Sequence, residues 1–241
     1  MGKNNLIKFW ILFVVSLPVI TSGCDSGDIY PKDKASGGTD VDVSVSFHFT
    51  HIDAFPESYK IVFGSFNDDL AYPISSKVIS KPSDNGVVTV SLANIPENTT
   101  YLALYLVQEH SNYKIYPFYT YPIISMPKED FEIPLQNIDL AMFGRVQKQV
   151  FSQCLQCHGG SGFAAAGLHL TEGKSHEDLV GITALHNTDK KRISPGNIQN
   201  SYLMDILKGE ALPNQHSSLS SLKDDDIVLV EQWIKGGAKS E

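Results

Sequence analysis

The sequence predicts a multidomain protein, with an all-β antiparallel sandwich over residues 40–136 and a small all-α domain over residues 137–241. Three observations predict this class. Apolar and polar residues alternate along short segments of the first part, turn-forming residues separate these segments, and steps of three and four residues replace the alternation near residue 137. The hydrophobic fraction of 42% and the charged fraction of 19% are ordinary for a globular chain.

Residues 1–23 have the pattern of an export signal peptide. Lys3 and Lys8 supply a positive start, and a twelve-residue apolar core over 9–20 is interrupted only by Ser16 and Pro18. Spanning a bilayer takes about 20 apolar residues, so this core is too short for a transmembrane helix. A buried N-terminal helix is the alternative interpretation.

The leader ends at Thr21-Ser22-Gly23-Cys24, which resembles a bacterial lipobox in which the cysteine is lipidated and becomes the new N-terminus. Most lipoboxes have leucine where this chain has Thr21. A lipidated Cys24 would anchor the exported protein to the surface of a lipid bilayer in the cell envelope. Residues 24–39 are rich in Gly, Ser, Asp and Lys, which predicts a flexible linker.

The sandwich prediction begins at residues 41–50, where Val41, Val43, Val45 and Phe47 alternate with polar residues. Five further segments favour strands, at 59–66, 75–80, 87–92, 100–108 and 113–123, so we expect about six or seven strands. Aromatic residues in the last segment could bind carbohydrate or protein, but strands also favour aromatic residues for packing. These residues are Tyr113, Tyr116, Phe118, Tyr119 and Tyr121.

The predicted helical part leads directly into Cys154-Leu155-Gln156-Cys157-His158. In an exported chain this C-x-x-C-H spacing indicates covalent attachment of a c-type haem. On one helical turn both thiols can form thioethers to the porphyrin, and His158 then serves as the proximal iron ligand. With Cys24 lipidated, the remaining pair excludes a disulfide framework.

Two other interpretations of the cysteine pair remain open. A zinc site would need further ligands, for which His169 and His176 are the candidates, although neither has a close partner in sequence. A redox-active dithiol would be expected at the start of a helix after a strand, whereas helical sequence precedes Cys154.

From about residue 142 the chain resembles single-haem cytochrome c domains of the planctomycete and Bacteroidetes type, which begin with C-x-x-C-H-G and close with W-I-x-x-G-A. The matching stretches are Cys154 to Gly159, Gly167-Leu168 with Leu170, Ile193 to Gly196, Ser201 with Leu203, and Trp233 to Ala238. The resemblance implies an all-α cytochrome c fold. It also implies that the carbonyl of Pro195 orients the ring of His158.

The resemblance leaves the sixth iron ligand open. Such domains usually have Met-Pro before the last helix, where this chain has Leu212-Pro213, and leucine cannot ligate iron. His216 in the same loop and Met204 in the preceding helix are the candidates, and an open or water-occupied position is the third. We expect the last helix to start near Leu222 and to bury Trp233 in the core.

The expected function is single-electron transfer through one covalent haem c to or from redox partner proteins of the cell envelope, and not enzymatic catalysis. Removal of Lys3 and Lys8 with the leader leaves 17 basic against 27 acidic residues, a net charge of -10 that disfavours nucleic acid as a partner. One alternative is a haem enzyme or gas-binding protein with an open sixth position. Another is an envelope lipoprotein whose sandwich binds carbohydrate or protein.

Overall fold

The computed structural model describes residues 38–83, 86–160, 162, 164–212, 214–216 and 222–241, all of which belong to one compact unit. The predicted leader, the lipidation site Cys24 and most of the predicted linker lie outside the described residues. Within the described ranges, no helix is long and apolar enough to cross a membrane.

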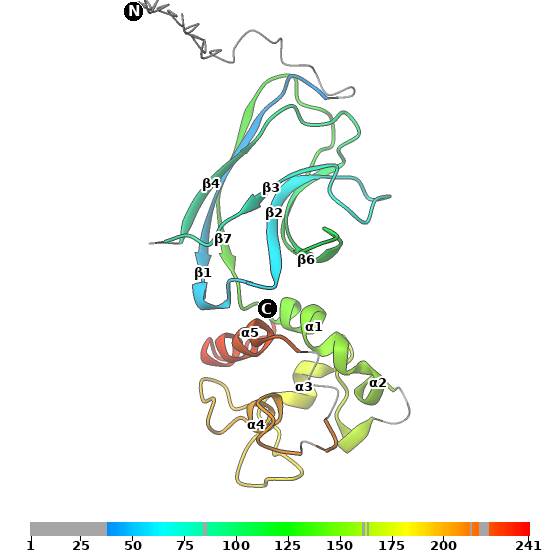
Figure 1. Cartoon of the computed structure of the whole chain (residues 1–241), viewed down its shortest axis with the longest axis vertical. Coiled ribbons are helices and arrows are strands. Elements are labelled where there is room, and N and C mark those ends of the chain that lie inside the picture. Colours follow the sequence, from blue (N-terminus) through cyan, green and yellow to red (C-terminus); the bar gives the residue numbers. More distant parts are fainter. Residues whose placement is uncertain (1–37, 84–85, 161, 163, 213, 217–221) are drawn as a thin grey trace, which may run out of the picture. The chain divides into compact units, whose positions relative to one another are not determined.

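Seven strands among the described residues form two sheets (Figure 1). The first sheet has the order β4–β1–β7, with β1 at Val43–Thr50, β4 at Val87–Leu92 and β7 at Phe131–Asp139. The alternation seen in the sequence puts Val43, Val45, Phe47 and Phe49 on the buried face of β1. Strand β4 pairs with β1 antiparallel, and β7 pairs with it parallel, so this sheet is mixed.

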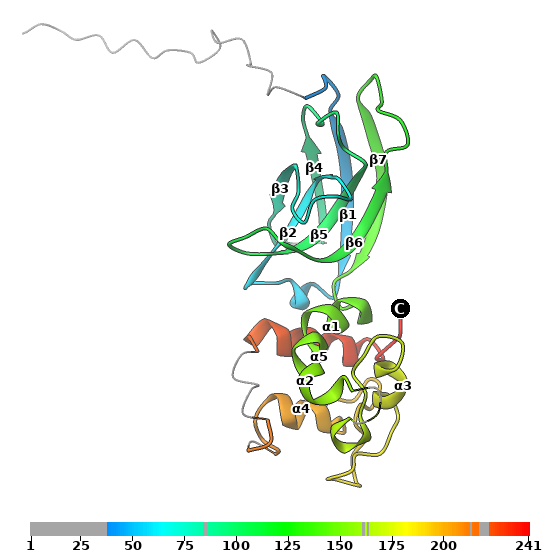
Figure 2. The ribbon, with the colours of Figure 1, turned by 90° about the vertical axis from the view of Figure 1, so that its right-hand side faces the viewer.

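The second sheet is antiparallel throughout, in the order β3–β2–β5–β6. Its strands are β2 at Tyr59–Phe66, β3 at Ser75–Ile79, β5 at Tyr101–Gln108 and β6 at Lys114–Pro122. The two sheets pack face to face (Figure 2), and the rings of Phe47 and Phe63 meet between them at 5.7 Å. All six segments predicted as strands correspond to β1–β6.

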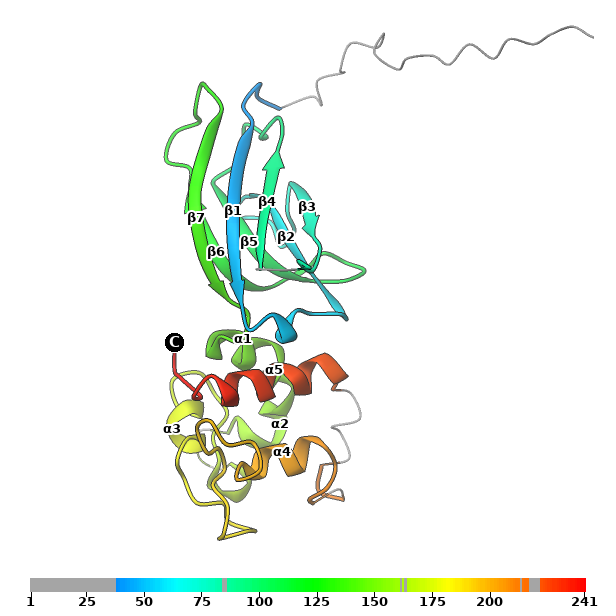
Figure 3. The same ribbon diagram turned by 90° about the vertical axis from the view of Figure 1, so that its left-hand side faces the viewer.

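The short helices follow β7, at the end of the sandwich where β1 and β7 finish (Figure 3). They are α1 at Phe143–Gln149, α2 at Leu155–His158, α3 at Ser175–Leu179, α4 at Tyr202–Leu207 and α5 at Asp224–Lys235. The described residues also form the 3-10 turns η1 at Ile52–Ala54, η2 at Phe151–Cys154 and η3 at Ala165–Gly167.

The expected fold class is wrong, because the first sheet is mixed and not antiparallel, and the second half is not an all-α domain. The protein is predominantly β, and no large all-α cytochrome c domain is formed by the described residues. In the part of the chain that the structure describes, the longest helix is α5 with 12 residues, and the other α-helices have four to seven. Between His158 and Tyr202 the described chain forms one five-residue α-helix, α3, and isolated bridges such as Val180 to Ile193. Matches to a few motif positions therefore did not imply that the segments between those positions are helical.

Helix α5 forms where the last helix was expected, although it begins at Asp224 and not at Leu222. Asp226 accepts from the backbone N–H of Lys223 at 3.0 Å, and the acidic first turn suits the positive end of the helix dipole. Trp233 is 3% exposed and its ring contacts Phe143 at 5.1 Å, so the prediction that it belongs to the core is confirmed.

A buried polar network joins the sandwich to the helices. Arg145 on α1 donates to the carbonyls of Ala54 and Leu140 at 2.8 and 2.7 Å, and to Oε1 of Gln149 at 2.8 Å. Gln149 in turn donates to Asp226 at 2.6 Å, which connects α1 with α5. The helical segment is therefore fixed to the end of the sandwich by groups that have no access to water.

Candidate functional site

The two cysteines and His158 lie on one short turn. Cys154 is the residue before α2, and Cys157 and His158 are within that helix. The turn continues from α1 and η2, whose Val146, Val150 and Phe151 are fully buried and hold it against the core. Sequence spacing alone therefore places the two thiols and the imidazole together.

This turn forms one wall of a cavity of about 350 Å³. Cys154, Cys157 and His158 line it on one side, and His216 lines it from a segment 58 residues further along the chain. The other lining residues are mostly apolar: Ala165, Ala166, Leu168, Leu170, Ala184, Leu185, Leu203, Ile206, Leu207, Leu212 and Leu222. Leu185 is 63% exposed, so the cavity reaches the protein surface.

The rings of His158 and His216 are parallel to within 5°, and their centroids are 6.4 Å apart. Nδ1 of His158 lies 3.1 Å from the carbonyl oxygen of Leu168, and Nδ1 of His216 lies 3.2 Å from that of Leu212. A carbonyl oxygen only accepts, so in both rings Nδ1 carries the proton and donates. Nε2 of each neutral ring then has the free lone pair that binds a metal.

The 6.4 Å between the ring centroids equals the separation that two imidazoles would have if both bound one metal ion through nitrogens that face each other. A metal–nitrogen distance of about 2.0 Å on each side, plus about 1.2 Å from each nitrogen to its ring centre, gives about 6.4 Å. Burial lowers the pKa of His158, against the effect of the hydrogen bond to Leu168, and the neutral ring is the form that binds metal. Two imidazoles and two thiols beside an apolar cavity fit a haem, whose porphyrin supplies the other four nitrogen ligands.

The alternatives for the cysteine pair have less support. Burial, with a smaller effect from Cys157, raises the pKa of Cys154 to about 11, opposite to the shift that a reactive dithiol requires. His169 and His176, the candidate zinc ligands, are engaged elsewhere: His169 pairs with Asp178 at 2.9 Å, and His176 contacts the carbonyl of Ala238 at 2.8 Å. Within the described residues, no three or more His, Cys, Asp or Glu side chains are grouped to hold a metal ion.

The other predicted site residues do not join His158. Met204 is 1% exposed and packs in the hydrophobic core, and it is absent from the described residues that line the cavity. Pro195 is exposed and likewise does not line the cavity within the described chain. The carbonyl at the ring of His158 belongs to Leu168, not to Pro195. Leu168 was noted in the sequence only as a motif match, because backbone contacts leave no side-chain signal.

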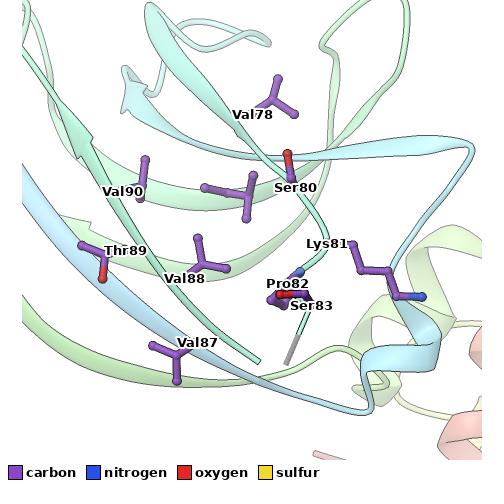
Figure 4. Close-up of a pocket in the computed structure, with 10 residues that line it drawn as sticks. Val78, Ser80, Lys81, Pro82, Ser83, Val87, Val88, Thr89 and Val90 are labelled. Carbon is purple, nitrogen blue, oxygen red and sulfur yellow. The ribbon is translucent and has the colours of Figure 1, made fainter. Parts of the chain in front are cut away.

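A second hollow, of about 470 Å³, lies between the edge strands β3 and β4 (Figure 4). Valine and serine side chains form most of its wall, and Lys81 is the only ionisable residue among the described residues that line it. Among the described residues, the wall of this hollow therefore has no group of side chains that would bind a metal ion. Of the aromatic residues that the sequence singled out, Phe118 is 8% exposed and Tyr116, Tyr119 and Tyr121 pack against the core, whereas Tyr113 is 48% exposed.

No protein-family model matches the chain. No curated protein matches its sequence either. The resemblance to single-haem cytochrome c domains is wrong for this chain, because its fold is predominantly β with short helices and the described residues contain no metal-holding group of three or more side chains. The short stretches that match the motifs are not connected by the expected helices, so they were not sufficient to assign the chain to that family.

Proposed function

We propose that the chain binds one covalently attached haem c in the cavity beside α2 and transfers single electrons in the bacterial cell envelope. Cys154 and Cys157 would hold the haem through thioethers, and His158 and His216 would ligate its iron from opposite sides. The observation that carries the proposal is the pair of parallel imidazoles, 6.4 Å apart, at a cavity that both cysteines line.

The residues have distinct roles in this proposal. Each thioether would form by addition of a cysteine S–H across a vinyl double bond, with the sulfur bonding one carbon and the proton going to the other, which would need no oxidant. The carbonyls of Leu168 and Leu212 hold the two imidazoles in the tautomer with a free Nε2. A haem in this position supplies an iron that changes between the ferrous and ferric states.

Electron transfer is favoured over catalysis by the second imidazole. With His216 opposite His158, both axial positions would be filled by the protein, which disfavours binding of a gas or substrate at iron. The exposed Cys157 and Leu185 leave one side of the cavity near solvent, as an exchange of electrons with partner proteins requires.

The decisive experiment is an absorption spectrum of the full chain, oxidised and dithionite-reduced, after expression in a host competent to attach haem to exported proteins. We expect sharp reduced c-type bands and haem that stays with the polypeptide after denaturation. Cys157→Ser should lose most of the covalent haem. A wild-type protein that carries no haem after such expression would overturn the proposal.

Three variants test the axial ligands. His216→Ala should change the iron from six-coordinate to five-coordinate and let the reduced protein bind carbon monoxide, whereas His158→Ala should take up little haem. Met204→Leu is the matched control, because Met204 is buried in the core, and its spectrum should equal that of the wild type. If Met204→Leu and not His216→Ala loses the six-coordinate form, the assignment of His216 is wrong.

Anchoring to the envelope is a separate part of the proposal, and it depends on the sequence around Cys24. The full chain should fractionate with membranes and incorporate labelled fatty acid, and Cys24→Ser should do neither. A wild-type protein found without lipid in the soluble fraction would remove the anchor but not the haem.

A further inference from the structure

The segment 165–170 forms the wall of the cavity next to His158, and hydrogen bonds hold it at several points. The carbonyl of Leu168 accepts from the ring of His158, and the N–H of Leu170 donates to the carbonyl of His158 at 2.8 Å. The carboxylate of Asp178 accepts from the N–H of His169 at 2.8 Å, and Gln147 donates to the carbonyl of Leu170 at 2.7 Å. The position of Leu168 thus depends on this segment keeping its shape.

The start of this segment is strained. Ala166 has φ of 54° and ψ of 22°, in the left-handed region that favours glycine. An alanine there costs roughly 1 kcal/mol relative to the ordinary helical conformation, so other contacts must hold it.

Arg192 makes that contact. Its Nη2 donates to the carbonyl of Ala166 at 3.0 Å, and its Nη1 donates to the carbonyl of Asp178 on α3 at 2.8 Å. The backbone of Arg192 is itself fixed, since its N–H donates to Ile182 and its carbonyl accepts from Leu203. One guanidinium therefore connects the strained turn with α3.

Arg192 also faces the cavity. Among the described residues that line it, Arg192 is the only lysine or arginine.

We propose that Arg192 is a positioning residue for His158: by clamping the turn at Ala166 to α3, it holds the Leu168 carbonyl on Nδ1 and thereby selects the tautomer whose Nε2 binds metal. The inference deepens the proposed function and rests on it for the role of Nε2. The planar fork of arginine reaches two carbonyls at once, whereas the single nitrogen of lysine is poorly placed to do so.

The test begins with the full chain without haem, using ¹⁵N shifts of the His158 ring to measure the ratio of its two tautomers. We expect the Nδ1–H form in the wild type and about a tenfold shift of the ratio toward Nε2–H in Arg192→Gln and Arg192→Lys. Lys191→Gln is the matched control, because its amino group donates to Thr183 on the surface. An unchanged ratio in both Arg192 variants would overturn the proposal.

Amide exchange provides a second measurement that does not depend on the tautomer signal. The N–H of Leu170 should exchange about tenfold faster in Arg192→Lys than in the wild type, while the N–H groups of β2 and β5 keep their protection. If Arg192→Gln proves unfolded, Arg192→Lys alone decides, because it keeps the charge. Unchanged exchange at Leu170 in folded Arg192→Lys would count against the clamp.

The reduction potential of the haem-loaded protein separates the clamp from a merely structural role. Arg192→Lys keeps the positive charge but weakens the hydrogen bond to His158, which makes the imidazole a poorer donor to ferric iron. Its potential should therefore become more positive, and that of Lys191→Gln should change less. If the wild type takes up no haem, the proposed function fails, and the tautomer measurement still decides the role of Arg192.

Discussion

Replacing Arg145 by methionine is expected to destabilise the protein by about 3–5 kcal/mol, because the change breaks a fully buried charged network. Arg145 has no exposed surface. Burial lowers its pKa to about 10, against the opposing effect of Asp225 and Asp226, so the side chain remains charged at neutral pH. The apolar side chain of methionine would fill most of the space that Arg145 occupies, but it would supply no hydrogen-bond donor.

The magnitude of this destabilisation follows from the buried groups that would lose Arg145 as their partner. The carbonyls of Ala54 and Leu140 would each lose a charged donor, and an unsatisfied buried acceptor costs about 1–3 kcal/mol. Asp226, also without exposed surface, would lose the nearby positive charge. Relief of the desolvation of Arg145 offsets part of this loss, so the net cost should lie below the full sum.

Urea denaturation provides the assay. The fluorescence of Trp233 reports on the helical segment and circular dichroism reports on the sheets, so two separate transitions in the variant would show that the network joins them. Lys148→Met on the same helix is the control, because the side chain of Lys148 is 52% exposed, and its effect should stay within about 0.5 kcal/mol. An Arg145→Met variant that loses less than about 1 kcal/mol would refute the reasoning.

Three further predictions concern other parts of the molecule. Burial, followed by two neighbouring carboxylates, raises the pKa of Tyr59 to about 12, above the ordinary value of 10.0. The contribution of Tyr59 to the free energy of unfolding should be complete below pH 10 and be lost as the pH rises to about 12. Tyr59→Phe should therefore flatten the dependence of the unfolding free energy on pH in that window. Gly64→Ala should destabilise the protein by about 2–3 kcal/mol in thermal unfolding, because the new Cβ would lie 2.5 Å from the carbonyl oxygen of Ser75. Gly162→Ala is the control and should cost little, since no described atom lies within 4 Å of its new Cβ. Equal effects of the two substitutions would contradict the clash at Gly64. Gln147→Leu should cost about 1–3 kcal/mol by urea denaturation, because it leaves a buried serine hydroxyl and a carbonyl without their partner, and a neutral outcome would show that the site rearranges.

Strand β7 shows where sequence reasoning failed in the fold. Pro134 lies within it, and a proline disfavours a strand because it has no N–H to donate, although an edge strand such as β7 tolerates it. The structure accommodates it at an irregularity: Val45 pairs with Ile133 and Phe47 with Gln136, so Pro134 is skipped in the ladder with β1. The helical steps expected near residue 137 therefore begin only after β7 ends at Asp139.

The sequence by itself determined the local features of this protein. Alternation with period two located β1, and strand-like runs between turn signals located β2–β6. The acidic first turn and the glycine pair bounded α5 approximately, and the C-x-x-C-H spacing placed Cys154, Cys157 and His158 on one turn. These features depend on residues within about ten positions of one another, for which spacing along the chain is enough.

Only the tertiary structure decided which distant groups meet. It paired β1 with β7 in parallel, brought the ring of His216 to 6.4 Å from that of His158 while Met204 packed in the core, and put the carbonyl of Leu168, not that of Pro195, at the ring of His158. Periodicity reports that a side chain is buried but not which surface buries it, and a backbone carbonyl leaves no trace in the residue type that carries it. Those contacts depend on how distant segments pack against one another. For this physical reason the sequence located the turn with Cys154, Cys157 and His158 but not the distant groups that lie beside it.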